Sequence, residues 1–227
     1  MDQKIRDIID LSEAQIADDE IKKGLLTYKQ LQFLLPKEKV YYVNYIIYLE
    51  DEFVIAELLW SAYVETVECC NRAIANLPIE DHFYFHFKKL ELFIHMADSN
   101  FEWYKSNQEE VQHYTAYLLQ TYAGNFEVLK RIMALYRVTG HNIEEEKLLD
   151  EVYNLNPDDF TILISKLVKH EKKEEYSMAA QILEKWIKAN KSVDFYTEIA
   201  YEKIIDLYTK LHNNEKADHY QDLLDNL

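Results

Sequence analysis

Two small groups of polar side chains have spacings suited to metal chemistry. Glu110 and His113 lie three residues apart, the Glu-x-x-His spacing that puts a carboxylate and an imidazole on one helix face in di-iron proteins. A di-iron bundle requires two such motifs and two further carboxylates, and this chain contains one motif. His82 and His86 are four residues apart, but no glutamate lies between them to act as a base. We therefore expect no metal and no other cofactor.

The glycine content excludes several other chemistries. The chain has three glycines, Gly24, Gly124 and Gly140, so it can form no Gly-rich phosphate loop, dinucleotide fingerprint or Gly-x-Ser-x-Gly elbow. Catalytic groups are commonly carried on loops, for which a chain so poor in glycine and proline has little material. We expect a protein that is not an enzyme. A helical enzyme with a metal site at Glu110 and His113 is the least favoured alternative.

Composition and charge narrow the class of partner. The 227 residues carry a net charge of −16, yet 48% are hydrophobic and 14% aromatic, which is typical of a folded protein. A net negative charge of this size repels other anions, so we do not expect the protein to bind nucleic acid or anionic membranes. The N-terminus shows no secretory signal, and charged residues interrupt the most apolar stretch, Val40 to Trp60. We expect a cytoplasmic protein, in which the adjacent Cys69 and Cys70 are small buried side chains rather than a disulfide.

Apolar residues recur at helical spacing almost throughout the chain, for example at Ile5, Ile8 and Ile9. Short polar breaks divide it into about twelve segments of roughly 12 to 20 residues, the length of ordinary helices. We expect a single helical-repeat domain over residues 1–227. Its six expected units are residues 1–36, 37–78, 79–124, 125–157, 158–192 and 193–227.

The C-terminal half shows internal self-similarity. The pattern of Leu129, Tyr136, Glu145 and Leu149 returns at the same internal spacing as Leu163, His170, Ala179 and Leu183, and again as Tyr201, Tyr208, Ala217 and Gln221. The period of about 34 residues is that of a helix-turn-helix repeat. Single hairpins of this kind cannot bury both apolar faces and must therefore stack.

The segment from Asn125 to Pro157 resembles a tetratricopeptide repeat, and Asp159 to Ser192 resembles a second one. The pattern departs from the family at Glu145, where a small residue normally lets the two helices cross closely. The resemblance implies an all-α fold: a right-handed superhelical solenoid of about six antiparallel hairpins. It also implies that the first helix of each hairpin lines a concave face, which usually binds a protein or peptide.

One candidate binding patch is aromatic. Residues 41–104 hold about half of the aromatic side chains, and Tyr41, Tyr45 and Tyr48 fall on one helical stripe while Val40, Val43 and Ile47 form a second stripe suited to the core. Tyrosine is enriched at interfaces because it combines a large contact area with a hydroxyl group. His82, Phe85 and Lys89 extend this candidate patch. The alternative is that these rings fill the space between hairpins.

A second candidate patch is cationic. Residues 125–192 are the least acidic part of the chain, and the repeat resemblance puts Lys130, Arg137 and Lys172 on the concave face. The lysine and asparagine arrangement with which some tetratricopeptide repeats clamp a C-terminal carboxylate is not reproduced. The alternative is that these cations form an ordinary solvated face.

Together these features favour a non-catalytic scaffold or adaptor that binds a protein or peptide on its concave face. Because rings provide hydrophobic contact and cations provide orientation, the expected ligand combines an apolar or aromatic anchor with acidic residues. The alternative is a self-associating structural protein that forms a homodimer through its aromatic surface.

Overall fold

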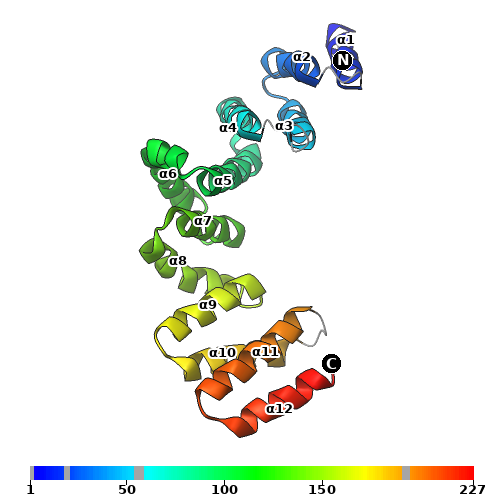
Figure 1. Ribbon diagram of the computed structural model, residues 1–227. Coiled ribbons are helices and arrows are strands. Elements are labelled where there is room, and N and C mark those ends of the chain that lie inside the picture. Colours follow the sequence, from blue (N-terminus) through cyan, green and yellow to red (C-terminus); the bar gives the residue numbers. More distant parts are fainter. Residues whose placement is uncertain (1–2, 18–20, 54–58, 191–194) are drawn as a thin grey trace. The chain divides into compact units, whose positions relative to one another are not determined.

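The computed structural model describes residues 3–17, 21–53, 59–190 and 195–227. These residues form α-helices, one short 3-10 helix (Ile79–Asp81) and no strand (Figure 1). The helices are α1 (Gln3–Ala17), α2 (Ile21–Leu34), α3 (Lys39–Phe53), α4 (Leu59–Asn76), α5 (His82–Ser99), α6 (Phe101–Thr121), α7 (Phe126–Thr139), α8 (Asn142–Leu155), α9 (Phe160–Lys172), α10 (Tyr176–Ala189), α11 (Phe195–Lys210) and α12 (Asn214–Asp225).

The helices pair in the way that the repeat spacing predicts. Each of the six expected units contains two of the helices, and the extensive contacts link helices that are successive in the chain. The contacts divide the chain into two compact units, residues 1–121 and 122–227. The all-α class and the hairpin architecture are therefore confirmed.

Helix caps explain why the hairpins of the C-terminal unit begin and end where they do. The side chain of Asn125 accepts a hydrogen bond from the backbone N–H of Val128, and Asp159, at the equivalent position of the next hairpin, does the same for Ile162. These bonds satisfy amide groups that a helix start leaves without a partner. Between α7 and α8, Gly140 has a φ of +77°, the left-handed conformation in which glycine ends helices without steric cost.

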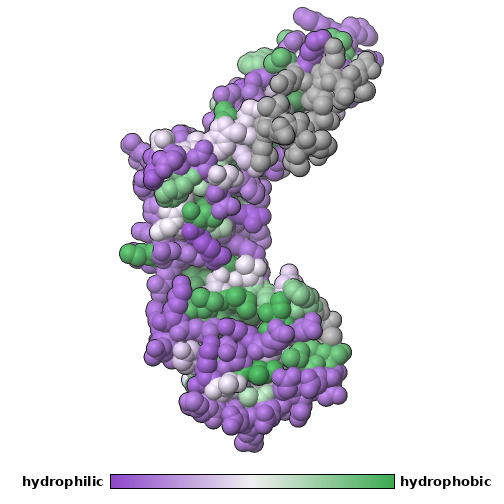
Figure 2. Space-filling view, viewed as in Figure 1, coloured by the Kyte–Doolittle hydropathy of each residue, from purple (hydrophilic) through white to green (hydrophobic). Residues whose placement is uncertain are grey.

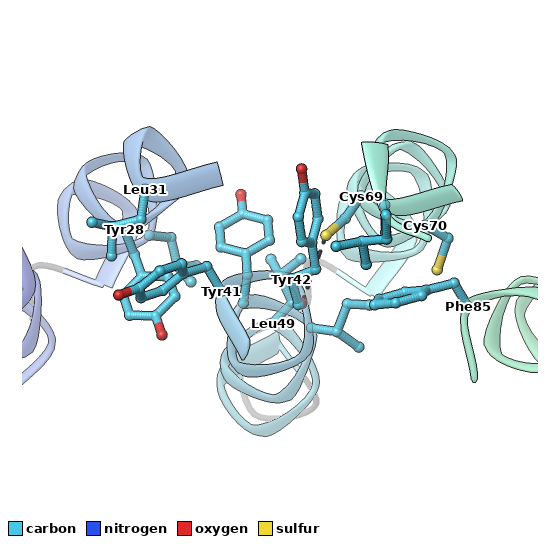
Figure 3. Packing of buried hydrophobic residues seen from close by; sticks show 13 residues of the cluster. Tyr28, Leu31, Tyr41, Tyr42, Leu49, Cys69, Cys70 and Phe85 are labelled. Atoms are coloured by element: carbon cyan, nitrogen blue, oxygen red, sulfur yellow. Dashed lines mark hydrogen bonds between the residues drawn. The ribbon is translucent and has the colours of Figure 1, made fainter. Parts of the chain in front are cut away.

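The core of the N-terminal unit is built from tyrosine as well as aliphatic side chains (Figure 3). Tyr28 of α2 packs edge-to-face against Tyr41 and Tyr48 of α3, with ring centroids 6.1 Å and 5.4 Å apart. Cys69 and Cys70 of α4 are fully buried in the same cluster and are free thiols, as expected. Burial raises the pKa of the Cys69 thiol to about 12, so this group is an inert apolar side chain.

Most residues of the two α3 stripes lie opposite to the expectation. Tyr41 and Tyr45 are 8% and 3% exposed, whereas Val40 and Ile47 are 49% and 43% exposed. A tyrosine can be buried when its hydroxyl group has a hydrogen-bond partner. The Tyr45 hydroxyl donates to the Glu65 carboxylate at 3.3 Å. Val40 and Ile47 thus lie on the solvent side of the helix, whereas Val43 is partly buried and packs against the core.

Each unit contains a carboxylate that ties several helices together. In the N-terminal unit, Glu65 of α4 accepts hydrogen bonds from Lys29 of α2 and Arg72 of α4 at 2.6 Å and 3.2 Å. In the C-terminal unit, Glu184 of α10 accepts bonds from Tyr208 of α11 and Lys216 of α12 at 2.6 Å and 2.9 Å. Charge-assisted bonds of this kind fix how consecutive hairpins stack.

The visible surface is largely hydrophilic, and hydrophobic residues reach it in separate patches (Figure 2). None of the helices formed by the described residues combines the length and the apolar character needed to cross a membrane.

Candidate binding groove

The C-terminal unit contains a groove of about 500 Å³ between α7, α8 and α9. Its apolar lining comes from Leu149 of α8 and from Ile164 and Val168 of α9. The α9 residues recur at i and i+4, so they form one stripe on the groove side of that helix. The remaining lining residues are polar or charged: Arg137, Asn142, Glu145, Glu146, Ser165, Lys169, Lys172 and Lys173.

Most of the charges around the groove are held by ion pairs within the unit. Arg137 contacts the Glu145 carboxylate at 2.7 Å and donates to the Ser165 hydroxyl at 3.1 Å. Glu145 stands where the tetratricopeptide pattern has a small residue, and here its carboxylate reaches from α8 to the guanidinium on α7. Lys173 of the groove pairs with Glu146 at 2.7 Å, and its hydrogen bond lowers the pKa of that carboxyl group.

Lys172 differs from the other groove cations. Its side chain is exposed, and it makes no ion pair with any residue that the structure describes. The groove has four cationic residues and two carboxylates, so its own charge is positive on a chain whose net charge is −16. Lys172 is the cation best placed to meet a negative group of a ligand.

Of the three cations of the candidate patch, Arg137 and Lys172 line this groove, and Lys130 lies elsewhere. Lys130 is one of the residues around a second cavity, of about 490 Å³, at the N-terminal end of α9. Its ammonium group is paired with the Asp159 carboxylate. The structure thus separates the predicted cationic patch into two sites.

The aromatic patch requires a correction. Tyr41 and Tyr45 belong to the core of the N-terminal unit and Tyr48 is half-buried against Tyr28, so the three rings do not form an open surface. Phe85 is completely buried and packs edge-to-face on Tyr42. The alternative, that the rings fill the space between hairpins, describes these residues.

The polar extensions of that patch are also internal contacts. His82 Nε2 lies 2.9 Å from the Leu77 carbonyl oxygen. Lys89 is buried: its ammonium group donates to the Asn71 side chain at 3.0 Å and lies 4.5 Å from the centre of the Tyr114 ring. Burial lowers the pKa of Lys89, and a group enclosed in this way does not meet a partner.

The candidate metal ligands form no cluster. Glu110 is exposed and lies 3.5 Å from the ammonium group of Lys89, and His113 is exposed. Within the described ranges, no group of three or more His, Cys, Asp or Glu side chains is placed to hold a metal ion.

Sequence reasoning missed part of the groove. Lys169, Lys173 and Ser165 line it and were not singled out. The signal was present in the sequence, because Lys166, Lys169 and Lys172 recur every three residues and so concentrate positive charge along one side of α9.

Comparison with known proteins adds one structural likeness. No family model and no curated protein sequence matches the chain. Among solved structures, it is similar to a tetratricopeptide repeat protein from Parabacteroides merdae, with 11% sequence identity and a TM-score of 0.47, over 96% of this chain and 77% of that one. The stacked-hairpin architecture described above rests on the helices and contacts of this chain itself.

Proposed function

We propose that the protein is a non-catalytic binding module that holds an acidic segment of a partner protein in the groove between α7, α8 and α9. The observation that carries the proposal is the composition of the groove. An apolar floor of Leu149, Ile164 and Val168 lies among four cations and two carboxylates, on a chain that is otherwise strongly acidic.

The floor and the cations have separate roles. An apolar side chain of the partner gains free energy when the floor removes it from water. The exposed ammonium group of Lys172 orients an acidic neighbour of that side chain and raises the association rate. Because most of the remaining surface repels an acidic segment, the charge distribution also selects this groove over other positions.

The test uses a short labelled peptide, capped at both ends, with a central leucine flanked by glutamates. A matched peptide carries glutamine at each glutamate position. Fluorescence anisotropy should show tighter binding of the glutamate peptide, and its affinity should fall as salt is raised, because exposed charges are screened. Equal affinity for the two peptides would contradict the proposal.

Two variants separate the groove from general electrostatics. Lys172→Glu should slow association, whereas Lys185→Glu, the same charge change on an exposed position of α10 that does not line the groove, should have a much smaller effect. Val168→Thr replaces an apolar group of the floor with an isosteric polar one and should raise the dissociation rate. If the two charge reversals acted equally, the acidic peptide would not be bound at this groove.

Self-association is the second candidate, and a specific observation favours it. Leu26 and Phe33 of α2 and Val40 of α3 expose large apolar side chains on the N-terminal unit. Light scattering over a concentration series distinguishes the two functions. A binding module stays monomeric, whereas a homodimer dissociates on dilution and is weakened by Phe33→Asp.

A further inference from the structure

The second cavity of the C-terminal unit lies beside the groove and has the opposite character. Three aromatic side chains line it: Phe160 at the start of α9, Trp186 near the end of α10 and Tyr196 at the start of α11. The Phe160 ring centroid lies 5.1 Å from that of Trp186 and 4.9 Å from that of Tyr196. The three rings are thus gathered at one side of the cavity.

The charge at this cavity is negative. Asp158, Asp159 and Lys130 are its charged lining residues. Lys130 and Asp159 neutralise each other, and Asp159 also caps α9 through its bond with the Ile162 N–H at 3.1 Å. The exposed carboxylate of Asp158 makes no ion pair or hydrogen bond with the described residues. Among the residues that the structure describes, one carboxylate without an ion-pair partner therefore lies next to the rings.

Aromatic rings and a free carboxylate together recognise cations. The face of an aromatic ring attracts an ammonium or guanidinium group within about 6 Å of its centre, and tryptophan and tyrosine do so more strongly than phenylalanine. The carboxylate adds a charge-assisted hydrogen bond. The cavity volume of about 490 Å³ is ample for one long cationic side chain.

The cavity and the groove lie along the same helix faces. On α9, Thr161 lines the cavity, and Ile164, Val168 and Lys172 line the groove, a spacing of three to four residues that keeps all of them on one stripe. On α7, Lys130 lines the cavity and Arg137, seven residues later, lines the groove. The two sites are therefore neighbours on one side of the α7–α9 pair.

From this arrangement we infer that the cavity formed by Phe160, Trp186, Tyr196 and Asp158 binds an arginine or lysine side chain of the same partner segment whose acidic part lies in the groove. This inference rests on the proposed function. Phe160 and Val168, near the middle of each site on α9, are eight residues apart, about 12 Å at 1.5 Å per residue. An extended peptide covers that distance in three or four residues. The partner segment thus carries a cation three or four residues from its acidic and apolar part.

The first experiment tests the cavity alone and does not depend on peptide binding in the groove. N-acetylarginine amide is titrated into the full chain, with N-acetylcitrulline amide as the neutral isostere, and the indole N–H resonance of Trp186 is followed by NMR. The arginine compound should shift this resonance and the citrulline compound should not. Equal shifts with both compounds, or no shift with either, would overturn the inference.

Matched variants locate the interaction. Tyr196→Ala and Asp158→Asn alter exposed side chains of the cavity and should abolish the arginine response. Met178→Ala is the control, because Met178 of α10 is 49% exposed and does not line the cavity. A response that survives Tyr196→Ala and Asp158→Asn would also overturn the assignment.

The second experiment tests the link to the groove. The leucine and glutamate peptide is extended with one arginine at increasing distance on either side, and each peptide is compared with its citrulline form. Arginine should tighten binding about three- to thirty-fold at a spacing of three or four residues, and less at shorter spacings. If the peptides bind but the arginine and citrulline forms have equal affinity at every spacing, one partner segment does not occupy both sites, while the proposed function stands. If no peptide binds, the proposed function fails. The response to N-acetylarginine amide still shows whether the cavity binds a cationic side chain.

Discussion

Replacing Tyr45 with alanine should lower the free energy of unfolding of the N-terminal unit, because Tyr45 is a core residue and not part of a binding surface. The ring is 3% exposed and lies in the core with Tyr28, Tyr41 and Cys69. Truncating a buried aromatic side chain to alanine removes its transfer free energy and leaves a cavity, at a cost of about 3–5 kcal/mol. Tyr45→Phe loses only the hydroxyl bond to Glu65 at 3.3 Å, which is worth about 1 kcal/mol.

The matched control is Ile47→Ala, two positions further along α3. Ile47 is 43% exposed, and its truncation should cost about 0.5–1 kcal/mol. Thermal unfolding monitored by circular dichroism, with hydrogen exchange of α2 and α3 as the local readout, measures the difference. Because about 1 kcal/mol corresponds to about 4 °C for a unit of this size, Tyr45→Ala should lower the unfolding temperature by about 12–20 °C. Equal effects of Tyr45→Ala and Ile47→Ala would refute the assignment of the tyrosine stripe to the core.

Three further predictions follow from buried or paired polar groups. Burial lowers the pKa of His86 from 6.5 to about 4. Between these two pH values the unfolded chain binds a proton at His86 and the folded chain does not, so the free energy of unfolding should fall as the pH drops from about 6.5 to about 4. His86→Gln should flatten this part of the pH profile, as measured by urea titrations. Glu184→Gln weakens the charge-assisted bond from Lys216 and should increase hydrogen exchange in α12 while leaving α5 unchanged. Elemental analysis of the protein should find no stoichiometric metal. In the double variant Glu110→Gln and His113→Ala, the unfolding temperature should not depend on added zinc or iron. Bound metal that is lost in this double variant would instead support the enzyme alternative.

The fold was predictable because it depends on local spacing. The recurrence from Leu129 to Leu163 marks the repeat, and the capping residues Asn125 and Asp159 recur at the same interval. Each hairpin depends mainly on its neighbours in the chain, so a pattern read over a short window is enough to predict the architecture.

The orientation of α3 was not predictable by the same reasoning. Both stripes of the helix are apolar enough to be buried. Which of them is buried depends on whether the neighbouring helices provide a hydrogen-bond acceptor for a tyrosine hydroxyl group. Tyr45 is buried because Glu65 of α4 accepts its hydrogen bond, and Tyr42 donates to the Pro36 carbonyl oxygen at 3.1 Å. Glu65 is distant from Tyr45 in sequence and becomes its neighbour only in the folded unit.

The residues of the candidate groove could be predicted only in part. Arg137 and Lys172 lie there because the repeat phase puts them on facing helices. Lys130 belongs to the same stripe as Arg137, but its pairing with Asp159 depends on the connection before α9 and assigns it to the second cavity. Helix periodicity predicts the face on which a cation lies, and it does not predict whether a carboxylate already neutralises that cation.

The most direct test of the central claim is an NMR map of the glutamate and leucine peptide on the full chain labelled with nitrogen-15. The proposal predicts that the largest shifts occur at the backbone amides of Ile164, Val168 and Lys172, and that amides on α12, which does not line the groove, stay unchanged. Shifts spread over other helices, with Ile164, Val168 and Lys172 unaffected, would contradict the claim that the groove between α7, α8 and α9 is the binding site.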